Sequence, residues 1–296
     1  MKIETVSVRV PGSTSNLGSG FDTLGLALRL YNRVRVSRVV GTDVKIVSQS
    51  PVEGRIKATA MLHEAAQLFF KRARVRAFGI EVELSGDVPV GRGLGASATA
   101  RLGVVVGLNQ LTQAGLNREQ LLEIVTELEG HPDNASPAMF GGFTVSGRVA
   151  GTVRCLRFRV SPRLKFVTLI PRFEINTEEA RKLVPPGFSR ADTVHSLNRA
   201  ALISAAFAGG RYEQLGGLFD DRVHQPYREQ LLPQLPRVTR AGERAGSIGG
   251  WLSGSGSAIM CPTLETPQQV ARAMSKQLPE SEILILTADN TGAKIE

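Results

Sequence analysis

One stretch of the sequence decides the fold, and it reads Pro89-Val90-Gly91-Arg92-Gly93-Leu94-Gly95-Ala96-Ser97-Ala98-Thr99. It follows a strand-like run and leads directly into a long apolar segment of helical character. Its three glycines let the backbone adopt positive φ and approach a ligand closely. The helix that follows begins with unpaired N–H groups at the positive end of its dipole. The stretch therefore predicts an anion site, where Ser97 and Thr99 add hydroxyls that reach a phosphate oxygen or a metal ion.

The sequence of this stretch excludes two well-known classes of glycine-rich phosphate loop. No Gly-Lys-Ser/Thr follows it, so it is not a Walker loop, and its glycines lack the Gly-x-Gly-x-x-Gly spacing of a dinucleotide fold. A tight turn from strand to helix, with Ala96 and Ser97 serving only close packing, remains the alternative on this stretch alone.

Composition limits the class of protein without choosing a partner. The chain has 296 residues, which indicates two domains or one large one. With 42% hydrophobic and 21% charged residues, wholesale disorder is excluded. The net charge of +9 favours anionic partners, but nucleic acid, membrane surfaces and phosphorylated metabolites all satisfy it.

Cysteine usage and apolar run lengths indicate a reducing compartment. Cys155 and Cys261 are too few and too far apart for a disulfide framework or a zinc site. The N-terminus lacks the layout of a signal peptide. The apolar stretch around Leu102–Leu108 is far shorter than the roughly 20 residues that span a bilayer. We therefore expect a cytoplasmic protein without a membrane partner.

Strands and helices alternate irregularly along the chain, which favours an α+β fold over a doubly wound sheet. We expect a strand at Val6–Val10 that ends at Pro11-Gly12. Further strands are expected at Val34–Val40, Val44–Ser48, Ile80–Leu84, Phe143–Ser146, Val153–Val160, Lys165–Ile170, Ile248–Leu252, Ala258–Cys261 and Ile283–Thr287. Helices are expected at Ile56–Phe70, Ala96–Ala114 and Asn117–Leu128, and over most of 177–245. We place a domain boundary near residue 155, giving an N-terminal domain of residues 1–155 with the phosphate loop and a C-terminal domain of residues 156–296.

The glycine-rich stretch resembles the phosphate loop of the GHMP kinases, although Ala96 stands where that family usually has serine. Four more segments follow the same family in order, and they are similar to its homoserine kinase branch. These segments are Val10–Gly25, Glu127–Pro137, Ile175–Arg181 with Asp221–Arg228, and Ser253–Ser257. The resemblance implies the two-domain GHMP kinase fold, with the active site between the N- and C-terminal domains. It covers Val8 to about Met260. Near the expected adenine pocket the chain departs from the family at Glu53–Ile56.

The resemblance also implies the residues that hold ATP and magnesium. Residues Pro89, Val90, Gly91, Arg92, Gly93, Leu94, Gly95, Ala96, Ser97, Ala98 and Thr99 would bind the phosphates of ATP. Ser97 and Glu127 would hold Mg²⁺, with Glu129 as the alternative carboxylate. Asn134 would lie near the reacting hydroxyl, and Asp133 occupies the place of the base in mevalonate kinases.

For the second substrate the resemblance implies an amino acid. Asn16, Asp22, Asn134, Thr177, Arg181 and Arg228 would line its pocket. The two guanidinium groups suit an α-carboxylate, and Asp22 suits an ammonium group. The implied reaction is ATP-dependent phosphorylation of the side-chain hydroxyl of L-homoserine to O-phospho-L-homoserine, a step of threonine biosynthesis. A homodimer is the expectation for this family.

Three alternatives stay open at this point. Another GHMP kinase, such as one acting on mevalonate or another small alcohol, would share the phosphate loop. The basic run Lys71–Arg76 and the net charge are compatible with nucleic-acid binding, but no recognised nucleic-acid motif is present, and we expect no nucleic-acid partner. A catalytically inactive homologue is disfavoured because Ser97, Glu127, Asn134 and Asp22 are all present.

Overall fold

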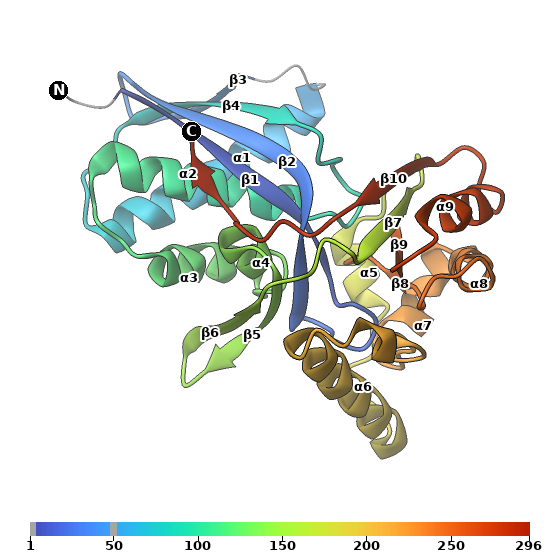
Figure 1. The fold of residues 1–296 in the computed structure, drawn as a ribbon. Coiled ribbons are helices and arrows are strands. Elements are labelled where there is room, and N and C mark those ends of the chain that lie inside the picture. The colour runs from blue at the N-terminus through green and yellow to red at the C-terminus, as the bar shows by residue number, and fades with distance from the viewer. Residues whose placement is uncertain (1–3, 48–51) are drawn as a thin grey trace.

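The computed structural model describes residues 4–47 and 52–296, and for residues 52–57 it describes the backbone alone. Two antiparallel-rich sheets organise the chain, each covered by helices on one side (Figure 1). The arrangement is the α+β fold that the sequence predicts. In the described part of the chain, no helix combines the length and apolar character needed to cross a membrane.

The first sheet has seven strands, ordered β11-β1-β2-β4-β3, with β5 paired to β2 and β6 to β5. Its strands are β1 (Thr5–Ser15), β2 (Leu24–Val39), β3 (Val44–Val47), β4 (Gly79–Gly86), β5 (Phe143–Val149), β6 (Thr152–Phe158) and β11 (Lys294–Ile295). The helices packed around it are α1 (Val52–Ala73), α2 (Ala96–Thr112), α3 (Arg118–Glu129) and α4 (Ala135–Phe140). Alternating apolar residues of β1 and β2 face α2, because side chains in a strand alternate between the two faces.

The second sheet has four strands in the order β10-β7-β9-β8. These are β7 (Lys165–Ile170), β8 (Trp251–Leu252), β9 (Ile259–Thr263) and β10 (Glu282–Leu286), with α8 (Leu235–Arg244) and α9 (Pro267–Ser275) packed against them. The segment between β7 and β8 is mostly helical: α5 (Thr177–Lys182), α6 (Arg190–Ala208), α7 (Gln225–Arg228) and the short 3₁₀ turns η1 (Tyr212–Leu215) and η2 (Glu229–Leu231).

A shared core joins the two sheets. Buried side chains of β2, including Leu26 and Leu28, belong to the same apolar cluster as Phe166 of β7 and Trp251 of β8. The expected boundary at residue 155 lies within β6, and β11 brings the C-terminal end of the chain back to β1. The first sheet therefore takes its last strand from the far end of the sequence.

The first strand differs from the sequence-based expectation. It does not end at Pro11-Gly12 but continues to Ser15, with a register shift between Pro11 and Ser13 where it pairs with β2. Such a bulge accommodates the missing N–H of proline without ending the strand. Because of this continuation, β1 brings the Ser13 and Ser15 hydroxyls within hydrogen-bonding distance of Asn134.

Candidate active site

The glycine-rich loop has the geometry that an anion site requires. Gly91, Gly93 and Gly95 have φ values of +67°, +71° and +73°, and α2 begins at Ala96 directly after them. Gly95 caps the helix without any side-chain hydrogen bond to its first N–H groups. Those N–H groups have no partner within the helix, so they are available to a phosphate.

Close packing also requires glycine at these positions. A Cβ atom at Gly93 would lie 2.0 Å from the carbonyl oxygen of Ser253, and one at Gly95 would lie 2.4 Å from Oγ of Ser13. The glycine-rich loop is thus held between β1 and the glycine-serine segment Ser253–Ser257. Within that segment, the Ser257 hydroxyl donates to the carbonyl of Phe173, 2.7 Å away.

Gly93→Ala is expected to destabilise the protein by at least twice as much as Gly210→Ala. Both glycines have positive φ, and alanine in that region costs about 1–2 kcal/mol. No atom lies within 4 Å of a Cβ at Gly210, whereas at Gly93 the Ser253 carbonyl must move. Urea unfolding of the two variants measures the difference. Equal losses of unfolding free energy would show that the loop is not held in this close contact.

The loop borders a cavity of about 160 Å³ in which the sequence-predicted residues converge from both halves of the chain. Its lining includes Asn16, Asp22, Pro89, Val90, Gly91, Arg92, Gly93, Gly95, Ala96, Ser97, Ala98, Asp133, Asn134, Thr177, Arg181 and Arg228. The Arg92 guanidinium itself is engaged by the Pro171 carbonyl at 2.9 Å and by Glu174 at 3.2 Å. Arg92 therefore offers the cavity its backbone rather than its charge.

Three predicted residues are not among those that line the cavity. Leu94 is a core residue, 1% exposed. The Thr99 hydroxyl is fully buried, donates to the Ala96 carbonyl and accepts from Asn32, so it stabilises the first turn of α2 instead of meeting a phosphate. The third is Glu127, which the resemblance implied as a magnesium ligand.

Glu129, not Glu127, lies beside Ser97. The Ser97 hydroxyl donates to Oε1 of Glu129 at 2.5 Å, and Arg101 donates to the same oxygen. Glu127 points away and pairs with Arg72 on the surface. Residues two apart on a helix are rotated by roughly 200°, so only one of the two carboxylates can face the cavity. The contact with Ser97 therefore favours Glu129, the alternative carboxylate, over Glu127.

The same contact gives the basic run 71–76 a structural role. Lys71 and Arg72 lie in the last turn of α1, where positive charge is favourable against the helix dipole, and Arg72 is held by Glu127. The run is a helix end with a surface ion pair, which weakens the case for nucleic-acid binding.

Asn134 is fixed by the extended end of β1. Its Nδ2 donates to Oγ of Ser15, and its Oδ1 accepts from Oγ of Ser13, both at 3.0 Å. Its backbone N–H donates to Asp133 at 3.1 Å. Sequence reasoning missed the two serines, because the turn predicted at Pro11-Gly12 would have placed them in a loop.

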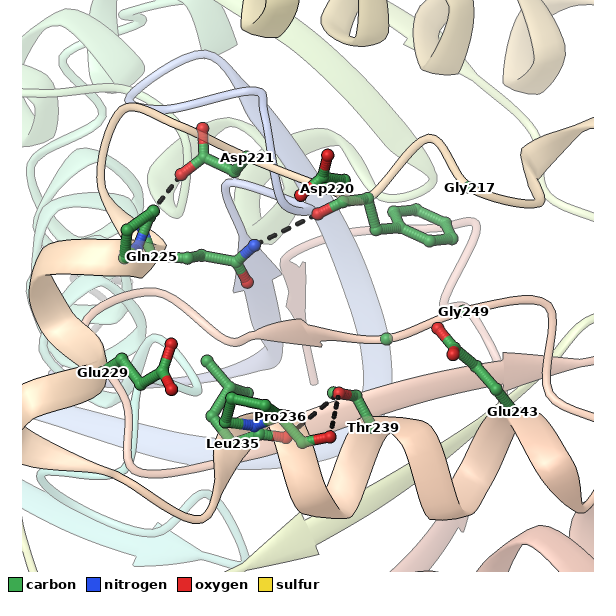
Figure 2. Close-up of a pocket in the computed structure, with 13 residues that line it drawn as sticks. Gly217, Asp220, Asp221, Gln225, Glu229, Leu235, Pro236, Thr239, Glu243 and Gly249 are labelled. Atoms are coloured by element: carbon green, nitrogen blue, oxygen red, sulfur yellow. Dashed lines mark hydrogen bonds between the residues drawn. The ribbon is translucent and has the colours of Figure 1, made fainter. Parts of the chain in front are cut away.

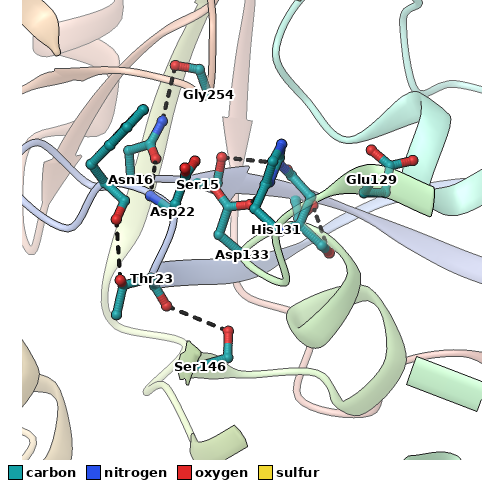
Figure 3. Close-up of polar contacts among 12 residues, drawn as sticks. Ser15, Asn16, Asp22, Thr23, Glu129, His131, Asp133, Ser146 and Gly254 are labelled. Atoms are coloured by element: carbon teal, nitrogen blue, oxygen red, sulfur yellow. Dashed lines mark hydrogen bonds and ion pairs between the residues drawn. The ribbon is translucent and has the colours of Figure 1, made fainter. Parts of the chain in front are cut away.

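Asp133 and His131 form a tight pair beside Asn134 (Figure 3). Burial alone would lower the pKa of His131, but the hydrogen bond and charge of Asp133 outweigh it and raise that pKa above its usual value. Burial would likewise raise the pKa of the Asp133 carboxyl, yet His131 and Ser15 lower it. Asp133 is therefore a weak base that is already occupied by its neighbours.

Asp22 and Arg181 form an ion pair at the border of the cavity. Both oxygens of Asp22 accept hydrogen bonds from the two terminal nitrogens of Arg181, each at 2.9 Å. The hydrogen bonds that Arg181 donates to Asp22 raise the pKa of its guanidinium further, so this group keeps its charge. An acid and a base in direct contact present both the charges that an amino-acid zwitterion needs.

Asp22 lies close to the pair formed by His131 and Asp133. One oxygen of Asp22, a ring nitrogen of His131 and an oxygen of Asp133 lie within 4.8 Å of one another. Asn16 holds this loop rather than reaching far into the cavity, since its Oδ1 accepts from the Asp22 N–H at 3.0 Å and its Nδ2 donates to the Gly254 carbonyl at 3.1 Å (Figure 3). On the opposite side, the Thr177 and Ser255 hydroxyls are hydrogen-bonded at 3.1 Å.

Arg228 is the most deeply buried arginine at the site, with 2% of its surface exposed. Its Nε donates to the carbonyl of Ala180 at 3.3 Å, and Nη1 donates to the carbonyl of Gly254 at 3.0 Å. Burial, reinforced by the positive charge of Arg181, lowers the pKa of Arg228 to about 10. It remains charged at neutral pH, which suits a role toward an anion.

A second cavity, of about 280 Å³, lies in the C-terminal half between residues 217–229 and α8 (Figure 2). Its lining carries four acidic side chains: Asp220, Asp221, Glu229 and Glu243. These carboxylates would repel a phosphate, and the glycine-rich loop is not among the residues that line this cavity. We therefore place the active site in the smaller cavity.

Lowering the pH should destabilise the fold through His224, a fully buried residue of the segment 221–228. Burial lowers its pKa to about 4. Above pH 6.5 His224 is neutral whether the chain is folded or unfolded, whereas between pH 6.5 and 4 only the unfolded chain binds the proton. This group should therefore cost about 2 kcal/mol of unfolding free energy between pH 7 and pH 5.

His224→Gln removes this titration and leaves that of His131 in place. Urea unfolding of both proteins at pH 7 and pH 5 gives the comparison. The wild type should lose about 2 kcal/mol more than the variant. Parallel losses would show that His224 does not stay neutral in the folded protein.

Comparisons with known proteins group the chain with one family. Residues 60–142 match the model "GHMP kinases N terminal domain", and residues 202–280 match "GHMP kinases C terminal". The homoserine kinase of Clostridium beijerinckii is 37% identical over 98% of both chains. The homoserine kinase of Caldicellulosiruptor bescii is 34% identical over 98% of this chain and 96% of its own.

Solved structures share the fold. The homoserine kinase from Cytophaga hutchinsonii superposes with a TM-score of 0.88 at 24% identity, covering 100% of this chain and 98% of that one. The L. major mevalonate kinase in complex with R-mevalonate gives a TM-score of 0.73 at 18% identity over 96% of both chains. At these identities the structures establish the arrangement of strands and helices alone.

Proposed function

The chain belongs to the GHMP kinase family, and on that premise we propose that it is a homoserine kinase, transferring a phosphoryl group from ATP to the side-chain hydroxyl of L-homoserine. The product is O-phospho-L-homoserine, an intermediate of threonine biosynthesis. Full-length relatives that carry this activity in their names, at 30–37% identity, support the proposal.

In the structure, the observation that most supports the proposal is the composition of one cavity. A phosphate loop and a pair of opposite charges, Asp22 and Arg181, border the same cavity. An acceptor with an ammonium and a carboxylate group would meet both of these charges, and its hydroxyl would lie on the side of Asn134. Mevalonate and galactose lack the ammonium group, so neither offers the Asp22 carboxylate a cationic partner besides Arg181.

Ser97 and Glu129 fit a magnesium ion. A hydroxyl and a carboxylate are the hard oxygen ligands that Mg²⁺ prefers, and both contacts made to Glu129 fall on Oε1, which leaves Oε2 for a ligand. When bound, the ion neutralises charge on the phosphates of ATP. The nearby Arg101 keeps the Glu129 side chain in place through its ion pair.

Transfer then depends on positioning and electrostatics. The N–H groups at the start of α2 bind and orient the phosphates, and Arg181 and Arg228 hold the carboxylate of homoserine. Asn134, fixed by Ser13 and Ser15, orients the attacking hydroxyl. We assign Asp133 the task of holding His131 and the Asn134 backbone rather than that of a strong general base, because its pKa is lowered and its Oδ1 contacts both His131 and the Asn134 N–H.

A panel assay tests the proposal. ADP release is measured with ATP and Mg²⁺ in the presence of L-homoserine, mevalonate or galactose. Homoserine should give kcat/KM at least about 100-fold above the others, the discrimination expected from losing one charged contact. Comparable rates with mevalonate would make the protein another kinase of the family.

The proposal extends to the setting in which the enzyme acts. We place it in the cytoplasm as a homodimer, which is the family-level expectation. Light scattering coupled to size-exclusion chromatography should give twice the monomer mass of 31.8 kDa. A single species at the monomer mass would remove this part of the proposal without affecting the assigned reaction.

A further inference from the structure

His224 contacts both halves of the amino-acid site, yet no role above uses it. Its ring is fully buried and stacks on Phe21 at 5.1 Å with an interplanar angle of 20°. Nε2 lies 2.7 Å from the carbonyl oxygen of Gly18, and Nδ1 lies 3.3 Å from Nη1 of Arg228. An arginine can only donate, so Nδ1 accepts and the ring proton resides on Nε2, from which it is donated to Gly18.

This tautomer determines which part of Arg228 a ligand can reach. The two hydrogens of Nη1 are taken by His224 and by the Gly254 carbonyl, and Nε donates to the Ala180 carbonyl. Within residues 4–47 and 52–296, no hydrogen-bond acceptor engages Nη2. The guanidinium is therefore held on three sides and presents Nη2 to a carboxylate.

The other hydrogen bond of His224 holds the loop that carries Asp22. That loop, residues 16–23, is joined to the C-terminal half at Gly18 through His224 and at Ser19, whose hydroxyl donates to the Asp220 carbonyl at 2.7 Å. Phe21, stacked on the ring, directly precedes Asp22. One imidazole thus contacts the segment that bears the acidic partner and the side chain that bears the basic one.

The backbone of His224 is itself anchored by Asp221. The two carboxylate oxygens of Asp221 accept from the N–H groups of Val223, His224 and Gln225, at 2.8–2.9 Å, and from the Ser196 hydroxyl. Figure 2 shows the bond from Gln225 to Asp221 beside the second cavity. Asp221 lies 3.5 Å from Nε2, but these donors saturate its oxygens.

We propose that His224 is a positioning residue that holds the Asp22 loop and Nη2 of Arg228 in place for the ammonium and carboxylate groups of the acceptor. This inference rests on the proposed homoserine kinase activity. The charged groups that face the ring are Asp221, Arg228 and Asp22. Burial, together with the charge of Arg228, keeps the ring neutral at physiological pH, as the lowered pKa of His224 indicates.

Three substitutions separate the two hydrogen bonds of the ring. His224→Gln places an amide near Nε2 and can keep the bond to Gly18, while His224→Asn places one near Nδ1 and can keep the bond to Arg228. His224→Phe keeps the shape and the stacking on Phe21 but loses both bonds. His195→Gln, at a histidine of α6 outside the cavity, is the matched control.

The readout is the steady-state KM for homoserine and for ATP in each variant, with the melting temperature recorded alongside. We expect His224→Phe to raise the homoserine KM by roughly 10- to 100-fold, the range for losing a hydrogen bond to a charged group. The ATP KM should change less than about two-fold, and the Gln and Asn variants should fall between wild type and Phe.

Each outcome decides for or against the inference. A homoserine KM that rises in the order wild type, Gln and Asn, then Phe supports it, including when the Phe variant is too unstable to assay and the two amide variants alone show the split. Equal changes in both KM values, or an unchanged homoserine KM in all variants, overturn it. Wild-type protein without homoserine-dependent ADP release would instead overturn the proposed function.

Discussion

Glu129→Gln is expected to lower kcat by about 10²- to 10³-fold, the loss typical of removing one preorganised charge stabiliser. The substitution keeps the size of the side chain and removes only its charge. Glu129 is the carboxylate held beside Ser97 and Arg101 in the first turns of α2, directly after the phosphate loop. Steady-state rates over a range of Mg²⁺ concentrations measure the effect, and half-maximal activity should require more Mg²⁺ in the variant.

Glu127→Gln is the matched control for this prediction. The two residues are of one type, lie two positions apart on the same helix and differ in the direction of their side chains. Glu127 pairs with Arg72 at the surface, where ion pairs contribute little, so its loss should change kcat less than about two-fold. If Glu127→Gln were the more damaging change, the placement of Ser97 and Glu129 as the metal ligands would be wrong.

Arg181→Ala is expected to raise the homoserine KM by about 10- to 100-fold and the ATP KM by less than about two-fold. In the free protein Arg181 forms two hydrogen bonds with Asp22, and its guanidinium borders the cavity on the side of Thr177. Losing it removes the cation that would meet the α-carboxylate and leaves Asp22 without its partner. Initial rates at saturating ATP and varied homoserine provide the measurement.

Lys182→Ala, at the exposed neighbouring residue of α5, controls for a general effect of removing positive charge from this helix. It should leave both KM values within about two-fold of wild type, because an exposed charge outside the cavity is screened by solvent. Arg181→Ala raising both KM values equally would speak against a substrate with opposite charges at this place.

Much of the site is predictable from the sequence because its parts are local. The glycine loop needs three residues with positive φ and a helix start, and a single short segment of the sequence contains both. Residues Asn16, Asp22, Thr177, Arg181 and Arg228 also lie in the cavity as expected, although Asn16 holds a loop where ligand contact was expected.

The remaining features depend on three-dimensional contacts that the spacing of residues in the sequence does not predict. Glu127 and Glu129 are indistinguishable until the rotation of α3 is fixed, and Thr99 is directed inward only because Asn32 of β2 meets it. The continuation of β1 past Pro11 depends on a bulge against β2, which delivers Ser13 and Ser15 to Asn134. No local sequence pattern marked His224 as part of the site. Its partner Gly18 lies far away in the sequence, and Arg228, four positions on, gives no pattern by itself.

Identification of the phosphorylated product tests the central claim most directly. Wild-type protein, Glu129→Gln and Glu127→Gln are each incubated with ATP, Mg²⁺ and L-homoserine, and the products are followed by ³¹P NMR and mass spectrometry. For the wild type and Glu127→Gln, we predict one phosphate monoester on the side-chain oxygen of homoserine for each ADP formed. In the same incubation time, Glu129→Gln should form almost no ester. ADP formation by the wild type without that ester would contradict the account.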